Sequence, residues 1–541
     1  MKVLMLNPEF PYSFWSFTQT RRSFGRKALV PPLGLMTVAA LLPEEWEVRL
    51  VDLNVRKLSQ GDWNWAEVVM ISAMLVQKQG MLGLIREARQ KGKTVVAGGP
   101  YPTSLPQEAL DAGCDFVVRG EGENTIPLLV SALGQELKQG VIEVNEKPDM
   151  STSPLPRFDL VRPADYVAAA VQTCRGCPFE CEFCDVVSLF GRKPRFKSPD
   201  QVIQELESLY RLGWRDHVFV SDDNFIGSRT HARALLAELI PWSEGRGEPF
   251  TFLTQASLNL GQDKEMIDLM TKANFWSVFI GIESPDENVL VLNRKFQNTK
   301  NPIVESLDNI KKNGLLTIAS FVIGFDGEAP GIGERICDLI EKTDVPLVSL
   351  NTVQALPNTS LWNRLKAENR LLEHKTGGDT TAGRLNFIPS RPEGEIMAEL
   401  TAAWQRLYDP SHYLERTYRY YLSMRPTRRS LGAEKPSAAP VLKERISPRR
   451  VLFDLYLFLR LLWVHSVRYG LRHRRLFWKQ LAGVLLKNPS RTSLYVNAVA
   501  LGENMFALTD EIRTRTRTAM ESDDTMSGPA AALGDSAARS E

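Results

Sequence analysis

The sequence carries almost no net charge and lacks a long hydrophobic run, and each absence narrows its function. Its 541 residues include 66 Lys and Arg against 64 Asp and Glu, which gives a formal net charge of +2 at pH 7. This balance argues against a dedicated nucleic-acid-binding surface. The apolar run near the N-terminus is too short for a signal peptide, so we expect a cytoplasmic protein.

Cysteine is also scarce, with six residues in the whole chain. Four of the six fall within eleven residues: Cys174, Cys177, Cys181 and Cys184. Such crowding in a long chain without a recognisable secretion signal argues against a disulfide framework and fits a reducing compartment. Cys114 and Cys337 lie in apolar stretches, and we expect them to be buried thiols.

The last three crowded cysteines have the spacing of an iron–sulfur ligand loop. Three residues separate Cys177 from Cys181 and two separate Cys181 from Cys184, with Phe183 directly before the last thiol. Each thiolate of such a loop can bind a different iron of a [4Fe-4S] cluster. Three ligands leave one iron open, where a substrate or cofactor can be chelated.

Two other interpretations of these cysteines stay open. Cys174 with Cys177, and Cys181 with Cys184, form two pairs of the kind that bind zinc. Zinc modules usually place about a dozen or more residues between their pairs, whereas three residues separate these. Alternatively, Cys174 closes the fourth iron of a ferredoxin-like cluster.

Residues 1–135 alternate short apolar runs with helical ones, which predicts a Rossmann-like α/β domain with a parallel sheet. We expect strands at residues 3–7, 48–52, 68–72, 94–97 and 116–119, and helices at 35–42, 81–90 and 125–133. Gly98, Gly99 and Gly120 follow two of these strands, where glycine lets a ligand approach the backbone. A dinucleotide fingerprint is missing after the first strand.

Residues 136–167 are rich in proline and are expected to form a linker. Residues 168–395 repeat strand then helix, as a partial (β/α)6 barrel requires. Its later strands are expected at 217–221, 250–255, 277–282, 317–323 and 347–353. Polar or small residues follow successive strands and should share one mouth of the barrel: Asp222, Asp223, Asn224, Gln255, Glu283, Ser284 and Gly324.

Residues 396–520 are expected to be helical, and the small, polar residues 521–541 to form a disordered tail. Within this region, residues 451–463 are strongly apolar and several arginines follow them. The run is too short to span a bilayer, and Asp454 and Arg460 interrupt it. Its composition fits an interfacial helix in peripheral contact with the inner face of a membrane through residues 451–480, or else a helix packed on the barrel or in a dimer seam.

The cysteine loop resembles the signature of the radical S-adenosylmethionine superfamily over residues 176–185. Residues 1 to about 420 resemble its cobalamin-dependent members, most of all the branch that contains bacterial hopanoid C-methylases. The stretches that carry this closer match are residues 176–185, 222–227, 354–357 and 361–362. The resemblance implies a cobalamin-binding first domain, a radical barrel and a helical C-terminal region.

The resemblance also implies the cofactors and the residues that hold them. Cys177, Cys181 and Cys184 would bind a [4Fe-4S] cluster. The implied contacts to S-adenosylmethionine come from the barrel mouth: Phe183, Asp222, Asp223, Asn224, Gln255, Glu283, Ser284 and Gly324. The implied contacts to cobalamin come from the first domain: Ser72, Met74, Gly98, Gly99, Pro100, Gly120 and Glu121. No histidine precedes His217, so cobalt would have no histidine ligand from this domain.

The implied reaction is C-methylation of an unactivated carbon in a lipid-like or other small-molecule substrate, with electrons from a flavodoxin- or ferredoxin-type donor. Radical cyclisation or oxidation without methylation is an alternative within the same architecture. An iron–sulfur electron carrier or a cobalamin-responsive regulator is an alternative of a different class. A flavodoxin-like domain that has lost its ligand is the alternative for residues 1–135.

Overall fold

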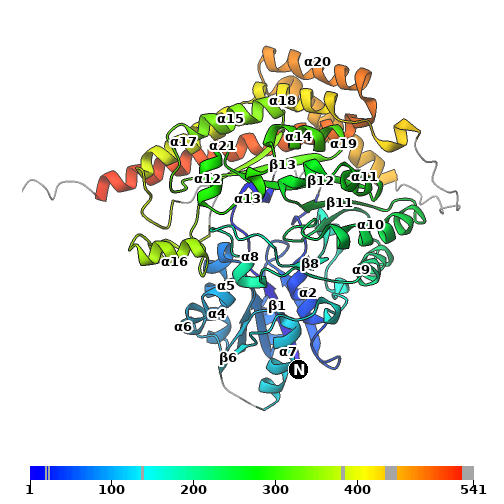
Figure 1. Cartoon of the computed structure of the whole chain (residues 1–541). Helices are drawn as coiled ribbons and strands as arrows, with labels where there is room; N and C mark the ends of the chain where they lie inside the picture. The colour runs from blue at the N-terminus through cyan, green and yellow to red at the C-terminus, as the bar shows by residue number, and fades with distance from the viewer. Residues whose placement is uncertain (19–20, 22–24, 136–138, 379–383, 433–447, 527–541) are drawn as a thin grey trace, which may run out of the picture.

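The computed structural model describes residues 1–18, 21, 25–135, 139–378, 384–432 and 448–526. They form two six-stranded sheets whose strands alternate with helices, and further helices follow the second sheet (Figure 1). The expected α/β class is confirmed, with a Rossmann-like first domain, a partial barrel and a helical C-terminal region.

The first sheet has the strand order β2-β1-β3-β4-β5-β6, and all its pairs are parallel. Its strands are β1 Lys2–Asn7, β2 Glu47–Asp52, β3 Val68–Ser72, β4 Thr94–Gly98, β5 Phe116–Arg119 and β6 Gly140–Glu143. Its helices are α2 Leu33–Ala39, α3 Gln60–Trp65, α4 Lys78–Gln90, α5 Pro100–Ser104, α6 Pro106–Asp111 and α7 Gly122–Gly134. Leu4 and Leu6 enter one core, and Val3 and Met5 enter another, so helices cover both faces.

Strand β6 is a departure from expectation, because it lies inside the range that we assigned to the linker. Its residues pair with β5 over its whole length, from Gly140 beside Phe116 to Glu143 beside Arg119. Only four residues long and exposed at alternate positions, it gives a weak apolar signal in the sequence. The first sheet therefore extends to residue 143.

The second sheet is also parallel throughout and has the order β14-β13-β12-β11-β10-β7. Its strands are β7 Ala168–Val171, β10 Asp216–Val220, β11 Phe250–Gln255, β12 Phe275–Glu283, β13 Leu316–Ile323 and β14 Leu347–Thr352. The longer helices around it are α9 Pro199–Arg211, α10 Arg229–Glu244, α11 Lys264–Lys272, α14 Ile303–Lys312, α15 Ile332–Thr343 and α16 Ser360–Ala367. Shorter elements are β8 Cys174–Arg175, α8 Val186–Phe190, β9 Arg195–Phe196, α12 Glu287–Leu292 and α13 Phe296–Thr299.

The C-terminal region consists of α17 Glu393–Leu407, α18 Pro410–Ser423, α19 Pro448–Val467, α20 Leu471–Lys487 and α21 Thr492–Met526. Tyrosines fix this region to the barrel: the Tyr408 hydroxyl donates to Val348 O at 2.6 Å, and that of Tyr420 accepts from Thr317 N at 3.0 Å. Residues 521–526 of the expected disordered tail belong to α21, and the rest lie outside the described residues. None of the described helices is long and apolar enough to cross a membrane.

The carboxyl-terminal ends of the two sheets face each other. Lys78, after β3, donates to Thr376 O at 3.4 Å, and Asn358, after β14, donates to Ser104 O at 3.1 Å. In parallel α/β folds, ligands bind at these strand ends. We therefore expect the active site in the region between the two sheets.

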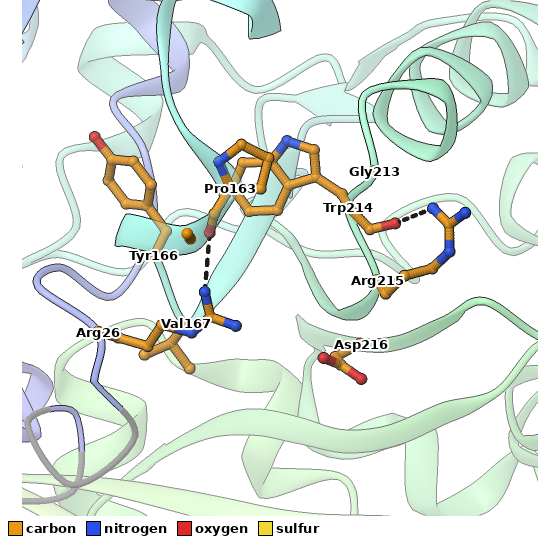
Figure 2. Close-up of a pocket in the computed structure, with 9 residues that line it drawn as sticks. Arg26, Pro163, Tyr166, Val167, Gly213, Trp214, Arg215 and Asp216 are labelled. Atoms are coloured by element: carbon orange, nitrogen blue, oxygen red, sulfur yellow. Dashed lines mark hydrogen bonds between the residues drawn. The ribbon is translucent and has the colours of Figure 1, made fainter. Parts of the chain in front are cut away.

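A cavity of about 260 Å³ lies at the opposite, amino-terminal end of the barrel (Figure 2). Arg26 donates to Pro163 O at 3.3 Å beside it, and Arg215 donates to Trp214 O at 2.6 Å. Its lining residues precede β7 and β10, on the side of the sheet away from the polar strand ends. We therefore place it outside the active site.

Candidate active site

The cysteine loop follows β8 at the carboxyl-terminal mouth of the barrel. It begins at Gly176, which has a φ of +93°. A side chain there would meet the backbone oxygens of Gly191 and Lys193 at 2.9 and 3.1 Å, so only glycine fits. The loop turns where Cys184 N donates to Cys181 O at 3.2 Å. Three free, partly exposed thiols result: Cys177, Cys181 and Cys184.

The fourth cysteine of the crowded segment is placed differently. Cys174 is buried, and its Sγ lies 3.9 Å from Asn224 O inside the protein. Burial, with the nearby carboxylate of Asp222, raises the pKa of the Cys174 thiol. A neutral, buried thiol is a poor fourth ligand, so the loop fits a cluster with one open iron.

Zinc draws all its ligands to one centre, whereas a [4Fe-4S] cluster spreads its ligands over different irons. Within the described residues, no group of three or more His, Cys, Asp or Glu side chains lies close enough to hold one metal ion. The sequence spacing of Cys177, Cys181 and Cys184 is that of a cluster loop.

Residues 293–298 cover the cysteine loop from the side of α12 and α13, and they were not among the predicted site residues. Asn293 O accepts from Glu182 N at 3.0 Å, and Gln297 Nε2 donates to Cys181 Sγ at 3.4 Å. Lys295 Nζ lies 5.8 Å from the centre of the Phe183 ring. The sequence signal was a lysine and two amides in a short turn between helices, which is too common to mark a site.

Lys295 is an ammonium beside the thiols. Its Nζ pairs with Glu283 Oε1 at 2.6 Å. Burial opposes the charge, but the Glu283 carboxylate outweighs it and keeps the pKa of Lys295 above its usual value. Burial raises the pKa of the Cys184 thiol, and the Lys295 charge works against that rise. Lys295 therefore stabilises negative charge at the cysteine loop.

Of the two acids after β10, Asp222 lies in the protein interior and bonds to groups there. It is fully buried and accepts from Cys174 N at 3.0 Å and from Thr173 N at 2.7 Å, while the Thr173 hydroxyl donates to its other oxygen. Asp223 is partly exposed and accepts from Gly176 N at 2.8 Å. Burial raises the pKa of Asp223 to about 6. Asp223 is thus the better placed of the two to meet a ligand.

The neighbouring strand ends bring further predicted residues to the same mouth. Asn224 exchanges hydrogen bonds with Ser257, donating to its Oγ at 3.1 Å, and Gln255 is half-buried at the end of β11. Glu283 ends β12 with a φ of +68°, at a bulge in the pairing with β13. A side chain at Gly281 would lie 2.3 Å from Glu283 Oε1, so glycine makes room for the carboxylate.

Three predicted residues are less directly placed. Ser284 is buried, and its hydroxyl accepts from Asp286 N at 3.1 Å. Gly324 has a φ of +103°, and a side chain there would meet apolar atoms of Leu385 and Val353, not open space. Phe183 is half-buried, with its ring centre 5.3 Å from that of Phe325. The contacts of all these residues to S-adenosylmethionine stay predictions.

The predicted cobalamin residues gather at the ends of β3, β4 and β5. Ser72 pairs with Gly98 in register, and a side chain at Gly99 (φ +92°) would lie 2.5 Å from Ser72 Oγ. Pro100 then opens α5. Met74 is half exposed, and its N–H donates to Gln77 Oε1 at 2.9 Å.

Gly120, after β5, lines a cavity of about 300 Å³ together with residues of both domains, among them Thr103, Leu189 and Asn358. The cavity lies at a strand end, where parallel α/β folds bind their ligands. The individual contacts to cobalamin stay predictions.

Glu121, one of the predicted cobalamin residues, is paired with two arginines in this structure. Both of its oxygens accept from Arg195, at 2.7 and 3.0 Å, and Arg175 donates to it at 2.8 Å. Arg175 also pairs with Glu123 at 2.9 Å, and Arg175, Glu121 and the Glu123 carboxylate are all buried. Burial opposes ionisation of Glu123, but Arg175 outweighs it and lowers the pKa of that carboxyl. These four residues form the interdomain ion network, which joins the first domain to the residues beside Cys177.

Comparison with known proteins agrees with this geometry. A B12-binding-domain model matches residues 26–130, and a radical SAM superfamily model matches residues 171–340. A domain of unknown function, DUF4070, matches residues 359–518. The chain belongs to the cobalamin-dependent radical S-adenosylmethionine methyltransferases, and its cofactors are a [4Fe-4S] cluster, S-adenosylmethionine and cobalamin.

Two curated relatives match nearly end to end. An uncharacterised methyltransferase of Synechocystis is 45% identical over 95% of this chain and 93% of its own length. The hopanoid C-2 methylase of Rhodopseudomonas palustris is 31% identical over 92% of each chain. The fold matches that of the cobalamin-dependent S-adenosylmethionine radical enzyme OxsB, solved with aqua-cobalamin and S-adenosylmethionine, with a TM-score of 0.59, 16% identity and coverage of 96% of this chain and 81% of that one.

Proposed function

We propose that this protein methylates an unactivated carbon of an apolar, polycyclic lipid-like molecule of the hopanoid type. The observation that carries the proposal is the match to a hopanoid C-2 methylase over 92% of both chains. The match extends over the C-terminal region as well as the two cofactor domains.

Apolar side chains inside the barrel support a substrate of this kind. Phe219 on β10 and Leu253 on β11 are paired in register, and both side chains are partly exposed. The residues next to them along the strands, Val218, Val220 and Phe252, are buried. Because side chains alternate across a strand, Phe219 and Leu253 point to the barrel interior.

The N-terminal segment adds to this apolar surface. Trp15 is 42% exposed, and its ring centre lies 5.1 Å from that of Phe279 on β12. Exposed aromatic surface at a barrel interior favours an apolar ligand.

The chain's own residues hold and position the reacting groups. When bound, the cluster with S-adenosylmethionine supplies a hydrogen-abstracting radical and cobalamin supplies the methyl group. Cys177, Cys181 and Cys184 would hold the cluster, Lys295 and Gln297 set the charge around it, and the interdomain ion network keeps the two domains in register. Fixed positioning of this kind is the main contribution that a protein makes to cofactor chemistry.

The proposal includes a flavodoxin- or ferredoxin-type protein as electron donor, because a [4Fe-4S] cluster must be reduced before each cleavage. It also includes peripheral contact with a membrane through residues 451–480, because an apolar polycyclic substrate partitions into a bilayer.

The test is anaerobic turnover of the reconstituted protein with cobalamin, reductant, a desmethyl hopanoid and S-adenosylmethionine that carries a deuterated methyl group. Mass spectrometry should find 5′-deoxyadenosine, S-adenosylhomocysteine and a hopanoid that has gained the labelled methyl. Deoxyadenosine with an oxidised or cyclised but unlabelled product would instead support the cyclase or oxidase alternative. If iron-replete protein formed neither 5′-deoxyadenosine nor S-adenosylhomocysteine, the radical reaction would be refuted.

A further inference from the structure

We propose that α19 and α20 form a docking surface for a bilayer that contains anionic lipid, with the helices lying on the membrane and not crossing it. This surface deepens the peripheral membrane contact of the proposed function, and vesicle binding tests it apart from methylation.

Charge is concentrated in this helical hairpin. Residues 448–487 contain nine Lys and Arg residues and a single acid, Asp454, which is a formal charge of +8. The whole chain carries +2, so the remaining residues carry −6. A local excess of this size, on an otherwise acidic protein, directs one end of the molecule toward an anionic surface.

Large apolar side chains are exposed on the same two helices. On α19 they recur at steps of three or four residues, which places them on one face: Tyr456, Leu459, Trp463 and Val467. The Trp463 side chain is 62% exposed, while Leu461, Val464 and His465 on another face are buried. On α20 the exposed set is Leu471, Trp478, Leu485 and Leu486, the last of them 83% exposed.

The two exposed faces adjoin each other. Trp478 Nε1 on α20 donates to Ser466 Oγ on α19 at 3.0 Å, which brings the faces together at their seam. Exposed cations, Arg475 and Lys479, lie within one helical turn of Trp478. Figure 1 shows α20 at the end of the molecule opposite the N-terminal sheet.

Charge complementarity selects the occupant. A second copy of this chain, docked through the same face, would bring together two segments that each carry a formal charge of +8. An anionic bilayer instead pairs lipid head groups with the cations and accepts Trp, Leu and Tyr at the interface. Because no described helix can cross a membrane, the contact is peripheral.

The experiment is co-sedimentation of the full-length reconstituted protein with vesicles of phosphatidylcholine, with and without phosphatidylglycerol. We expect binding only when phosphatidylglycerol is present, and weaker binding at high salt. Arg475→Gln with Lys479→Gln should weaken it about 25-fold, at about fivefold for each cation. Leu459→Ser with Trp463→Ser should weaken it at least about tenfold.

Matched controls lie on other exposed helices and loops. Lys57→Gln with Lys264→Gln removes two exposed cations elsewhere, and Leu128→Ser with Leu155→Ser removes two exposed leucines; both should bind as the unaltered protein does. Equal binding to neutral vesicles, or no loss in the α19 and α20 variants, would overturn the proposal. So would a dimer by light scattering that these variants abolish while vesicles are not bound, since that outcome assigns the face to a second copy.

Discussion

At the residue scale, the position of Cys174 separates the cluster types that the cysteine spacing left open. Its Sγ is buried against Asn224 O, whereas the other three thiols are partly exposed. We predict that Cys174→Ser keeps its iron and still cleaves S-adenosylmethionine, since the hydroxyl fits the same buried place. Cys181→Ser should lose the cluster.

Iron and sulfide analysis with electron paramagnetic resonance of the anaerobically reconstituted variants checks this prediction. Loss of iron from Cys174→Ser in a protein that remains folded by circular dichroism would show a fourth cysteine ligand. That result would favour the electron-carrier alternative.

Lys295 and Gln297 give a second prediction at this scale. A positive charge and an N–H···S hydrogen bond both stabilise the reduced, more negative cluster. Lys295→Met and Gln297→Leu should therefore each shift the cluster reduction potential to a more negative value, while Lys295→Arg restores most of it.

A redox titration followed by electron paramagnetic resonance measures this shift. Lys311→Met is the matched control, because Lys311 is also buried and ion-paired but lies on α14 beside Asp308. An unchanged potential in both the Lys295 and Gln297 variants would limit residues 293–298 to a structural role.

Sequence reasoning could single out Cys177, Cys181 and Cys184 because their spacing alone predicts a ligand loop, and their binding of the cluster stays a prediction. It could not find Lys295 or Gln297, which reach the cysteine loop from residues more than 100 positions away. It also could not tell Asp222 from Asp223: both follow the same strand, and only the packing against Thr173 and Cys174 assigns one of them to the interior.

At the element scale, the positions of most strands could be predicted from the sequence, because a parallel strand buried on both faces has a short continuous apolar run. The runs at 68–72, 116–119 and 250–255 match β3, β5 and β11. Strand β6 could not be predicted, because an edge strand of four residues with two exposed positions has no such run. The ion pairs between the domains could not be predicted from the sequence either, since they join residues about 50 to 70 positions apart.

The contact between α19, α20 and α21 contains a histidine pair that predicts a pH dependence. His465 Nδ1 and His473 Nε2 lie 2.9 Å apart, and Glu503 on α21 is 3.4 Å from His465. Burial, with the neighbouring His465, lowers the pKa of His473 to about 4, and Asp409 only partly offsets this. Tyr469 packs on the His473 ring.

A lowered pKa means that the unfolded chain binds a proton more tightly than the folded one does. Stability from this site is therefore present above the unfolded pKa of about 6.5 and is lost as pH falls toward 4. We expect the folded state to lose up to about 2 kcal/mol between pH 7 and pH 5. Thermal unfolding across this range should show the loss, and His473→Asn should flatten it. An equally steep profile in His473→Asn would place the titration elsewhere.

At the scale of the whole molecule, the interdomain ion network holds the cobalamin domain against the barrel. Removing one partner of a buried ion pair typically costs about 3–5 kcal/mol, because a charge is left buried without compensation. We predict that Arg175→Met lowers the free energy of unfolding by about 3 kcal/mol and makes residues 144–167, between the two sheets, more sensitive to protease.

Arg157→Met is the matched control for this prediction. Arg157 pairs with Asp159 at 2.7 Å on the surface, where the side chains are 44% and 50% exposed, so its loss should cost at most about 1 kcal/mol. Calorimetry and limited proteolysis compare the two variants. Equal stability of both would mean that the domains are held by their other contacts.

The same network limits how this molecule could be recombined with its relatives. A chimera that received residues 1–135 from another protein would leave Arg175 and Arg195 without their carboxylate partners unless the donor carried acids at the positions of Glu121 and Glu123. The two cofactor domains of a chimera would therefore have to be matched at these four positions, although each domain has its own sheet and core. The C-terminal helices lie at the far end of the molecule from that junction, so their exchange would leave the interdomain ion network intact (Figure 1).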